Sequence, residues 1–280
     1  MELAQIEMQP IQKDKKTGIV YRAWRTRSPE AILLLVHGLG AHTDRWEFLE
    51  NFFLKNDVSV YAIELKGFGE TEGLRGHVDS FDIYLEDILH LYGIAAKENS
   101  GKKVFLLGES MGALIAFVAV VVKPDLFSGL ISLSPAFKSR LGENIFNYVK
   151  YLSPNLYNPK KQFSMPFDSE MCTRDVDYQK VLDRDAERDR LATSKLLLNI
   201  LITQMRSWGL KTKVRIPVLF LLAGDDKIVN PEVSKEFFKN LKAKDKKIIE
   251  YPGMRHALSI DLGREAVFGD ILKWIEARVK

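Results

Sequence analysis

Short runs of almost wholly apolar residues recur along the chain and predict the strands of a sheet. Strands that are apolar on both faces are typical of a parallel sheet lying between two layers of helices. These runs cover residues 31–36, 58–63, 104–107, 130–133, 218–222 and 247–251.

Between these runs, apolar residues recur at three- and four-residue spacing, which is typical of helices that bury one face. Asn230 before Pro231 is a favourable helix start, because Asn caps free N–H groups and Pro fits the first turn. The predicted helices cover residues 44–54, 81–96, 111–122, 231–241 and 264–279. Since strands and helices alternate, we expect an α/β fold with a mostly parallel sheet flanked by helices.

The alternation stops between Phe137 and Val214, where helical patterns appear but no convincing strand does. We therefore predict a mainly helical cap over residues 138–213, inserted between a first part of the core, 1–137, and a second part, 214–280. At the start of the chain, residues 3–8 and 19–24 flank a turn-rich link and predict an antiparallel hairpin.

Composition narrows the class of protein. The first thirty residues carry many charges and no apolar run of signal-peptide kind, and no run approaches the roughly 20 residues of a membrane helix. A single cysteine, Cys172, cannot form an internal disulfide or a cysteine metal cluster. The net charge of +4 comes from scattered Lys and Arg residues that form no contiguous block, which argues against nucleic-acid binding. We expect a cytoplasmic protein with no metal, and the sequence leaves its oligomeric state open.

A candidate nucleophile follows the strand at 104–107. The segment Gly108-Glu109-Ser110-Met111-Gly112 has the G-x-S-x-G pattern, and a helical pattern begins directly after it. The turn must hold Ser110 in a strained conformation above the sheet, and only glycines at 108 and 112 allow the neighbouring backbone to pack close enough. Ser110 is therefore the predicted nucleophile.

A serine hydroxyl needs a base, and the base needs an acid that orients it. His256 lies just after the last predicted strand, at the sheet edge that also carries Ser110. Two adjacent aspartates, Asp225 and Asp226, follow the strand at 218–222, and both satisfy the chain order serine, acid, histidine. We favour Asp226, because Asp225 beside Gly224 suits a turn-forming role.

An acyl-transfer site also needs two N–H donors for the oxyanion. One is Met111, directly after the nucleophile. The loop after the strand at 31–36 offers the other, since glycines flank Leu39 in His37-Gly38-Leu39-Gly40. We expect His37, which precedes this loop, to make structural hydrogen bonds.

These same residues make the chain resemble the monoacylglycerol lipase and lysophospholipase branch of the α/β-hydrolases, from about residue 19 to 274. The chain departs from that branch's usual residues at Glu64, Thr71 and Ala113, and none of these is a triad position. The segments that carry the resemblance are 37–46, 64–81, 108–112, 173–175, 217–229 and 251–256.

The resemblance implies an α/β-hydrolase fold with a lid, no cofactor and a small lipid-ester substrate. Carried over residue by residue, the triad falls on Ser110, Asp226 and His256, and the oxyanion donors are Leu39 and Met111. Family members use the cap to cover an acyl tunnel, which makes Ile145 and Val149 candidate substrate contacts. Ordinary packing of a cap helix explains these two residues equally well.

The leading hypothesis is ester hydrolysis through an acyl-serine, with a fatty acid released from monoacylglycerols. The alternatives are a lysophospholipase, a general carboxylesterase, a peptidase or amidase, and a binding protein of slow turnover on the same fold. Basic residues near the apolar stripe of the cap also allow transient contact with a membrane surface.

Overall fold

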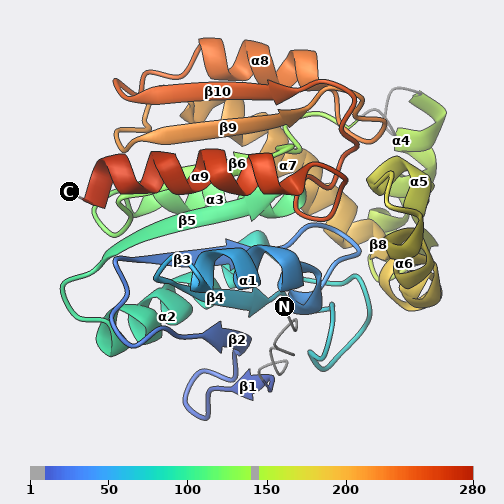
Figure 1. Ribbon diagram of the computed structural model, residues 1–280. Coiled ribbons are helices and arrows are strands. Elements are labelled where there is room, and N and C mark those ends of the chain that lie inside the picture. The colour runs from blue at the N-terminus through green and yellow to red at the C-terminus, as the bar shows by residue number, and fades with distance from the viewer. Residues whose placement is uncertain (1–9, 140–144, 280) are drawn as a thin grey trace.

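A mostly parallel sheet forms the centre of the molecule (Figure 1). The computed structural model describes residues 10–139 and 145–279. Within them the central sheet has eight strands in the order β1-β2-β4-β3-β5-β6-β9-β10. The strands are β1 (Gln12–Lys13), β2 (Val20–Trp24), β3 (Ala31–Val36), β4 (Val58–Glu64), β5 (Lys103–Glu109), β6 (Gly129–Leu133), β9 (Val218–Ala223) and β10 (Lys246–Tyr251).

The predicted strands from 31–36 to 247–251 are all present, with bounds that differ from the prediction by two residues at most. Only β2 runs against the others, and it pairs in antiparallel register with both β1 and β4, Val20 lying opposite Lys13 and Glu64. The expected first hairpin strand, 3–8, lies outside the described residues, and Gln12–Lys13 pairs with β2 instead. Because β3, β5, β6, β9 and β10 are parallel, their carboxyl ends meet at one edge.

Helices cover both faces of the sheet, as the alternating pattern predicts (Figure 1). Successive strand residues point to opposite faces, so Leu33 and Leu35 pack under one layer and Leu34 under the other. One layer consists of α1 (Glu47–Leu54) and α9 (Arg264–Val279), and the other contains α2 (Phe81–Glu98), α3 (Met111–Val122) and α8 (Pro231–Lys239). The first part of the predicted 44–54 helix is a separate 3-10 turn, η1 (Thr43–Trp46).

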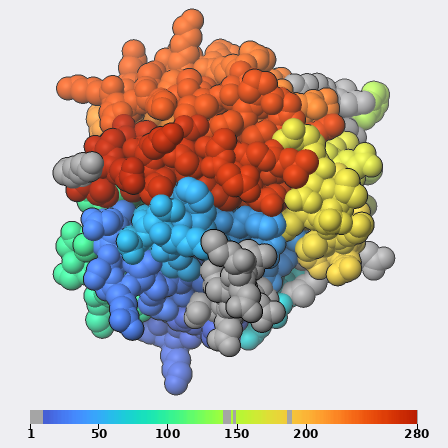
Figure 2. Space-filling view, in the orientation of Figure 1, coloured from blue at the N-terminus to red at the C-terminus, as the bar shows by residue number. Residues whose placement is uncertain are grey.

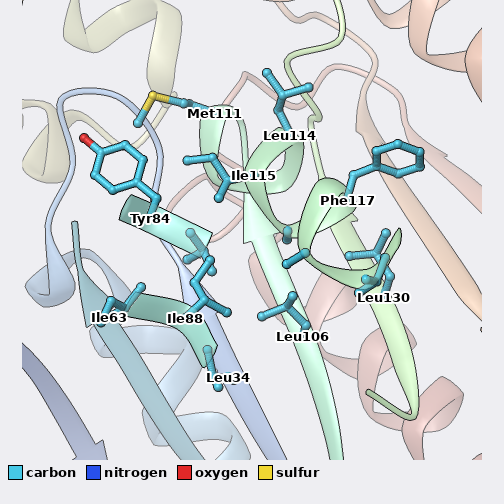
Figure 3. Close-up of a cluster of buried hydrophobic side chains, with 14 of the residues drawn as sticks. Leu34, Ile63, Tyr84, Ile88, Leu106, Met111, Leu114, Ile115, Phe117 and Leu130 are labelled. Atoms are coloured by element: carbon cyan, nitrogen blue, oxygen red, sulfur yellow. The ribbon is translucent and has the colours of Figure 1, made fainter. Parts of the chain in front are cut away.

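Helix α3 is the most deeply buried of these helices. Its side chains Leu114, Ile115 and Phe117 lie among residues of α2 and of strands β5 and β6 in one apolar cluster (Figure 3). A helix that is apolar on nearly every side must be covered on every side. Its first residue, Met111, is therefore held in a fixed position at the carboxyl edge of the sheet.

The segment between β6 and β9 differs from the prediction in one way. We expected no strand there, but Gln162–Ser164 (β7) and Leu191–Thr193 (β8) form a two-stranded antiparallel sheet. Three-residue strands are too short to show a hydrophobic period. The helices are α4 (Ile145–Leu152), η3 (Ser153–Leu156), α5 (Ser169–Cys172), α6 (Val176–Asp189) and α7 (Ser194–Leu210).

This inserted segment stands beyond the carboxyl ends of the parallel strands (Figure 1). Its helix α7 packs against α3, and its yellow part lies at the right-hand end of the face that α9 covers (Figure 2). The segment thus lies over the edge at which the predicted site residues meet. Among the described residues, no helix is long and apolar enough to cross a membrane.

Candidate active site

Ser110 occupies the turn between β5 and α3 in a strained conformation, with φ 57° and ψ −119°. Such a φ is rare for a residue with a side chain and is found where a turn is forced by its surroundings. The glycines on either side allow this turn. A Cβ at position 108 would lie 2.4 Å from the Gly112 oxygen, and a Cβ at 112 would lie 2.1 Å from the Val36 oxygen. The sharp turn that the sequence predicts is therefore present.

His256 and Asp226 form a buried pair at the same edge. The Nδ1–H of His256 donates to Oδ2 of Asp226 over 2.7 Å. The other carboxylate oxygen accepts the backbone N–H groups of Ile228, at 2.8 Å, and Val229, at 2.9 Å. Three donors thus fix the carboxylate, and the carboxylate fixes the imidazole tautomer. Nε2 is left as the nitrogen that can accept a proton.

Two opposing effects act on the pKa of His256. Burial lowers it, while the negative charge of Asp226 and the hydrogen bond to Asp226 raise it, and the net result is a raised pKa. The charged imidazolium is therefore stabilised even though the ring is buried. A base that must accept a proton during a reaction needs this property.

The neighbouring Asp225 has cationic partners in place of a histidine. Its carboxylate pairs with Lys227 and lies 3.4 Å from Arg255, and its side chain is 37% exposed. Its backbone N–H donates to the Met254 oxygen over 3.0 Å, which joins the two loops. Of the two adjacent aspartates, the geometry thus places Asp226 against the histidine and gives Asp225 a role in loop structure.

The two candidate oxyanion donors lie beside Ser110. Met111 is the first residue of α3, and the first N–H groups of a helix have no partner within it. Leu39 lies in the loop after β3, between Gly38 and Gly40, whose φ is 73°. A Cβ at position 38 would come within 3.1 Å of the Ser110 Cβ. A side chain at 38 would therefore crowd the nucleophile, and glycine lets this loop approach it closely.

Ser110, His256, Leu39 and Met111 all line one cavity beneath the inserted segment. Most of the remaining lining is apolar and comes from both the core and the insertion. It includes Ala136, Tyr151, Leu152, Met165, Phe167, Leu197, Ile200, Leu201, Ile228 and Ile260. The cavity therefore joins the candidate nucleophile to a pocket that suits a hydrocarbon chain.

The structure corrects the expected cap contacts. Val149 is 60% exposed and does not line the cavity. Tyr151 and Leu152, on the inward side of the same helix, line it instead. The side chain of Ile145 lies outside the described part of the molecule. The apolar stripe of α4 was identified, but its period does not tell which side faces the cavity.

Sequence reasoning missed three charged residues that line the cavity, Arg45, Glu109 and Arg190. Glu109 directly precedes the nucleophile, and Arg45 follows the oxyanion loop. Arg45 donates from its guanidinium to Oδ2 of Asp185 in α6 over 2.8 Å, which ties the inserted segment to the core. No spacing rule marks Glu109 or Arg45, because each finds its partner more than 100 positions away.

His37 is buried but has a different environment. Its Nδ1–H donates to the Gly38 oxygen over 2.8 Å, and Nε2 accepts the Leu65 N–H over 3.0 Å. Burial lowers the pKa of this histidine to about 3. Both ring nitrogens are therefore occupied by backbone groups, which matches the structural role expected from the sequence.

Comparison with known families supplies the class of protein. The model of the Hydrolase_4 family, described as serine aminopeptidase, S33, matches residues 27–263. The chain belongs to this family. Hydrolase_4 proteins are α/β-hydrolases, and the sheet order, the turn at Ser110 and the His256–Asp226 pair agree with that fold. The protein is thus a serine hydrolase of the α/β-hydrolase type.

Similar proteins of known name are mainly lipases. Human monoglyceride lipase is 27% identical over 262 residues, which are 92% of this chain and 86% of that protein. Phospholipase YtpA of Bacillus subtilis is 26% identical, over 88% of this chain and 95% of that protein. The solved structure of Paleococcus ferrophilus monoacylglycerol lipase has a TM-score of 0.83 at 27% identity and covers 93% of this chain and 99% of its own.

Proposed function

We propose that this Hydrolase_4 protein hydrolyses carboxylic esters through an acyl-Ser110 intermediate, and that monoacylglycerols are its substrates. One observation carries the proposal: a single apolar cavity contains Ser110 and His256, and Asp226 holds the histidine. We further propose that residues 138–213 act as a cap over this cavity and that no cofactor takes part.

The reaction follows from the roles of these groups. His256 accepts the Ser110 proton at Nε2 while the serine oxygen attacks the ester carbonyl, and the N–H groups of Leu39 and Met111 receive the oxyanion. The bond to the alcohol oxygen then breaks, and the alcohol leaves with the proton from His256. Water, deprotonated by His256, attacks the acyl-serine, and His256 returns the proton to the Ser110 oxygen as the fatty acid leaves.

The lining of the cavity favours a lipid ester over a peptide. Each buried methylene contributes about 0.8 kcal/mol, so an apolar pocket favours medium or long acyl chains over acetate. An aminopeptidase substrate would bring a charged amine that needs an acidic partner. Glu109 is the carboxylate in the described lining, and both of its oxygens already accept hydrogen bonds from Ser259. Human monoglyceride lipase among the relatives supports the same choice.

Lysophospholipids are the second candidate substrates. They also present one acyl chain, and a phospholipase is among the relatives. The guanidinium groups of Arg45 and Arg190 in the lining would favour an anionic head group. Both groups are already paired with aspartates, Asp185 and Asp183, which weakens this attraction. We therefore rank monoacylglycerols first.

We also propose transient contact between the cap and a membrane surface. Elements α4, η3 with the following Tyr157, and α7 expose a group of apolar side chains that we call the cap patch, and the three elements contact one another. Exposed Lys150, Lys160 and Lys161 lie in the same part of the chain. Apolar side chains beside cations are typical of proteins that dock onto anionic lipid surfaces. The cap patch comprises Phe146, Val149, Leu156, Tyr157 and Met205.

A labelling and substrate experiment tests the activity. A fluorophosphonate should label the wild-type protein at Ser110, because an activated serine attacks phosphorus as it would a carbonyl. In a panel of lipid esters, kcat/KM should be higher on monoacylglycerols than on lysophospholipids, diacylglycerols or aminoacyl amides. Labelling that persists in Ser110→Ala, or faster cleavage of aminoacyl amides, would overturn the proposal.

A matched pair of valines tests the membrane contact. Val149, in the cap patch, and Val176, at the start of α6, are exposed to similar extents, 60% and 62%. Val149→Asp should weaken sedimentation with anionic phosphatidylglycerol vesicles several-fold and leave cleavage of p-nitrophenyl acetate unchanged. Val176→Asp should alter neither. Equal vesicle binding by the two variants would contradict docking through the cap patch.

A further inference from the structure

Glu109, the residue directly before the nucleophile, carries a buried carboxylate that the reaction described above does not use. It ends β5 and is 9% exposed. Its Oε1 accepts the backbone N–H of Ser259 over 3.1 Å, and its Oε2 accepts the Ser259 hydroxyl over 2.8 Å. Ser259 is itself buried at 1% exposure. One side chain thus holds both the backbone and the side chain of a residue 150 positions away.

This contact joins the two loops that must cooperate in catalysis. Ser259 lies three residues after His256, and Glu109 lies one residue before Ser110. The histidine loop is also held from the inserted segment, where Ala257 N–H donates to the Cys172 oxygen over 2.9 Å. The Glu109 contact ties the loop to the strand that carries the nucleophile. The position of the imidazole relative to the serine therefore depends on it.

The carboxylate also places a negative charge near the imidazole. His256 is faced by two acidic groups, Asp226 and Glu109, and both raise its pKa against the lowering effect of burial. Burial raises the pKa of Glu109 and the two hydrogen bonds from Ser259 oppose that rise, with a raised pKa as the net result. Burying a carboxylate is unfavourable unless it is well hydrogen-bonded. Besides the hydrogen-bonded Ser259, the titratable groups that interact with the Glu109 charge include His256, Asp226, Cys172 and Tyr178.

We propose that Glu109 is a positioning residue whose clamp on Ser259 sets the histidine loop against the nucleophile and supplies His256 with a second negative neighbour. The inference rests on the proposed roles of Ser110 and His256. It predicts that loss of the Glu109 charge changes the pH dependence of labelling at Ser110. Loss of the hydrogen bonds to Ser259 should instead lower the catalytic rate. A purely structural role would change stability alone.

The chain offers a matched control for this carboxylate. Glu64, at the end of β4, is also buried, and it accepts the backbone N–H of Thr43 over 3.1 Å and the Thr43 hydroxyl over 2.9 Å. It therefore has the same arrangement of donors as Glu109. Glu64 does not line the cavity and is not among the groups that shift His256. Glu64→Gln removes a buried charge from the same kind of contact, beside His37 at 3.9 Å, and without a direct effect on His256.

The decisive experiment is the pH dependence of fluorophosphonate labelling at Ser110, which needs no knowledge of the substrate. Reaction requires neutral His256, and the negative charge of Glu109 favours the protonated form. Glu109→Gln should therefore shift the acid limb of the labelling rate to lower pH, by roughly half a unit to one unit. Glu64→Gln should leave its midpoint unchanged. An unshifted midpoint in Glu109→Gln, or an equal shift in both variants, would overturn the proposal.

Ser259 variants test the clamp if Glu109→Gln folds poorly. Ser259→Ala removes the hydroxyl donor and keeps the carboxylate, so the rate should fall about tenfold with KM nearly unchanged, since a small misplacement weakens the transition state. Ser259→Thr restores a hydroxyl and should recover most of that rate. Equal rates in Ser259→Ala and the wild type would contradict the clamp. If wild-type Ser110 is not labelled at all, the proposed function fails and not merely the role of Glu109.

Discussion

The molecule contains two buried histidines in loops at the same edge of the sheet, and their pKa values are shifted in opposite directions. His37 follows β3 and is 1% exposed, whereas His256 follows β10 and is 5% exposed. Burial lowers the pKa of His37 to about 3. Burial also lowers the pKa of His256, but Asp226 reverses the effect and the net pKa is raised. The same residue type at similar depth is a neutral hydrogen-bonding group in one loop and, by our proposal, a base in the other.

The partners of each ring explain the difference. Backbone groups occupy both nitrogens of His37, and neutral backbone groups do not compensate a buried positive charge. His256 uses one nitrogen on an acidic partner and presents the other to a cavity. Burial therefore does not identify a catalytic histidine. We propose that two features together identify it: a carboxylate bonded to one ring nitrogen and an open cavity at the other.

The largest effect should come from removing the base or the nucleophile. Ser110→Ala and His256→Ala should each lower kcat by about 10⁴- to 10⁶-fold, and the double variant should lose little more, because the groups act as a unit. Steady-state kinetics on a p-nitrophenyl ester measure this. Losses that add in the double variant would mean that the two residues do not share one mechanism.

The next largest effect separates the adjacent aspartates. Asp226→Asn should lower kcat by about 10³- to 10⁴-fold, because the amide neither fixes the tautomer nor balances the imidazolium, and His256 then resembles His37. Asp225→Asn should change kcat by less than about threefold, since its exposed contacts to Lys227 and Arg255 are weak. If Asp225→Asn proved the more damaging variant, the pair seen at 2.7 Å would not be the working one.

Much of the core fold and of the candidate site could be predicted from the sequence. The buried parallel strands show as apolar runs, and the G-x-S-x-G turn and the position of His256 after the last strand follow from local pattern. The choice of Asp226 over Asp225 depended on one glycine and the direction of a loop. Local patterns worked here because each strand end is adjacent in sequence to the residue it positions.

The structure of the inserted segment and the contacts of Glu109 and Arg45 could not be predicted from the sequence in the same way. Helix α6 is polar along most of its length, so its apolar residues form no clear stripe. Strands β7 and β8 have three residues each, which is too short for a hydrophobic period. Glu109 and Arg45 take their roles from partners distant in sequence. A single sequence carries no signal for such pairs. The inward side of α4 likewise depends on packing that its own residues do not encode.

A third experiment measures the acid limb of activity, which reports His256 directly. The base works only when neutral, so activity should fall about tenfold per pH unit below its pKa. Because the net pKa of His256 is raised above the ordinary value of 6.5, the midpoint should lie above 6.5. A kcat/KM profile from pH 5 to 9 tests this, and a flat profile between pH 5 and 8 would exclude a histidine base.

A fourth experiment shows that His37 serves the fold. His37→Ala removes two hydrogen bonds and leaves the buried Leu65 N–H without its acceptor, so the free energy of unfolding should fall by about 2–4 kcal/mol. Urea unfolding at pH 7 measures this. At temperatures where the variant is folded, its kcat should stay within about tenfold of the wild type. A loss as deep as that of His256→Ala would make His37 part of the chemistry.

The smallest effect follows from the opposite signs of the two pKa shifts. His37 stays neutral in the folded protein down to about pH 3, while the same histidine in the unfolded chain takes up a proton near 6.5. The unfolded state therefore binds more protons in that window, and stability falls by about 1.4 kcal/mol for each unit of pH decrease. His256 acts the other way, since its raised pKa contributes stability that is full below 6.5 and is lost as pH rises through the folded pKa.

Between pH 6.5 and pH 5, the wild type should lose about 2 kcal/mol more than His37→Ala, because only the wild type keeps this neutral histidine. The difference between the two proteins cancels the titration of groups that they share. Urea unfolding of both proteins at the two pH values measures this. If both lost the same unfolding free energy, His37 would accept a proton in the folded state, and the contrast with His256 would be lost.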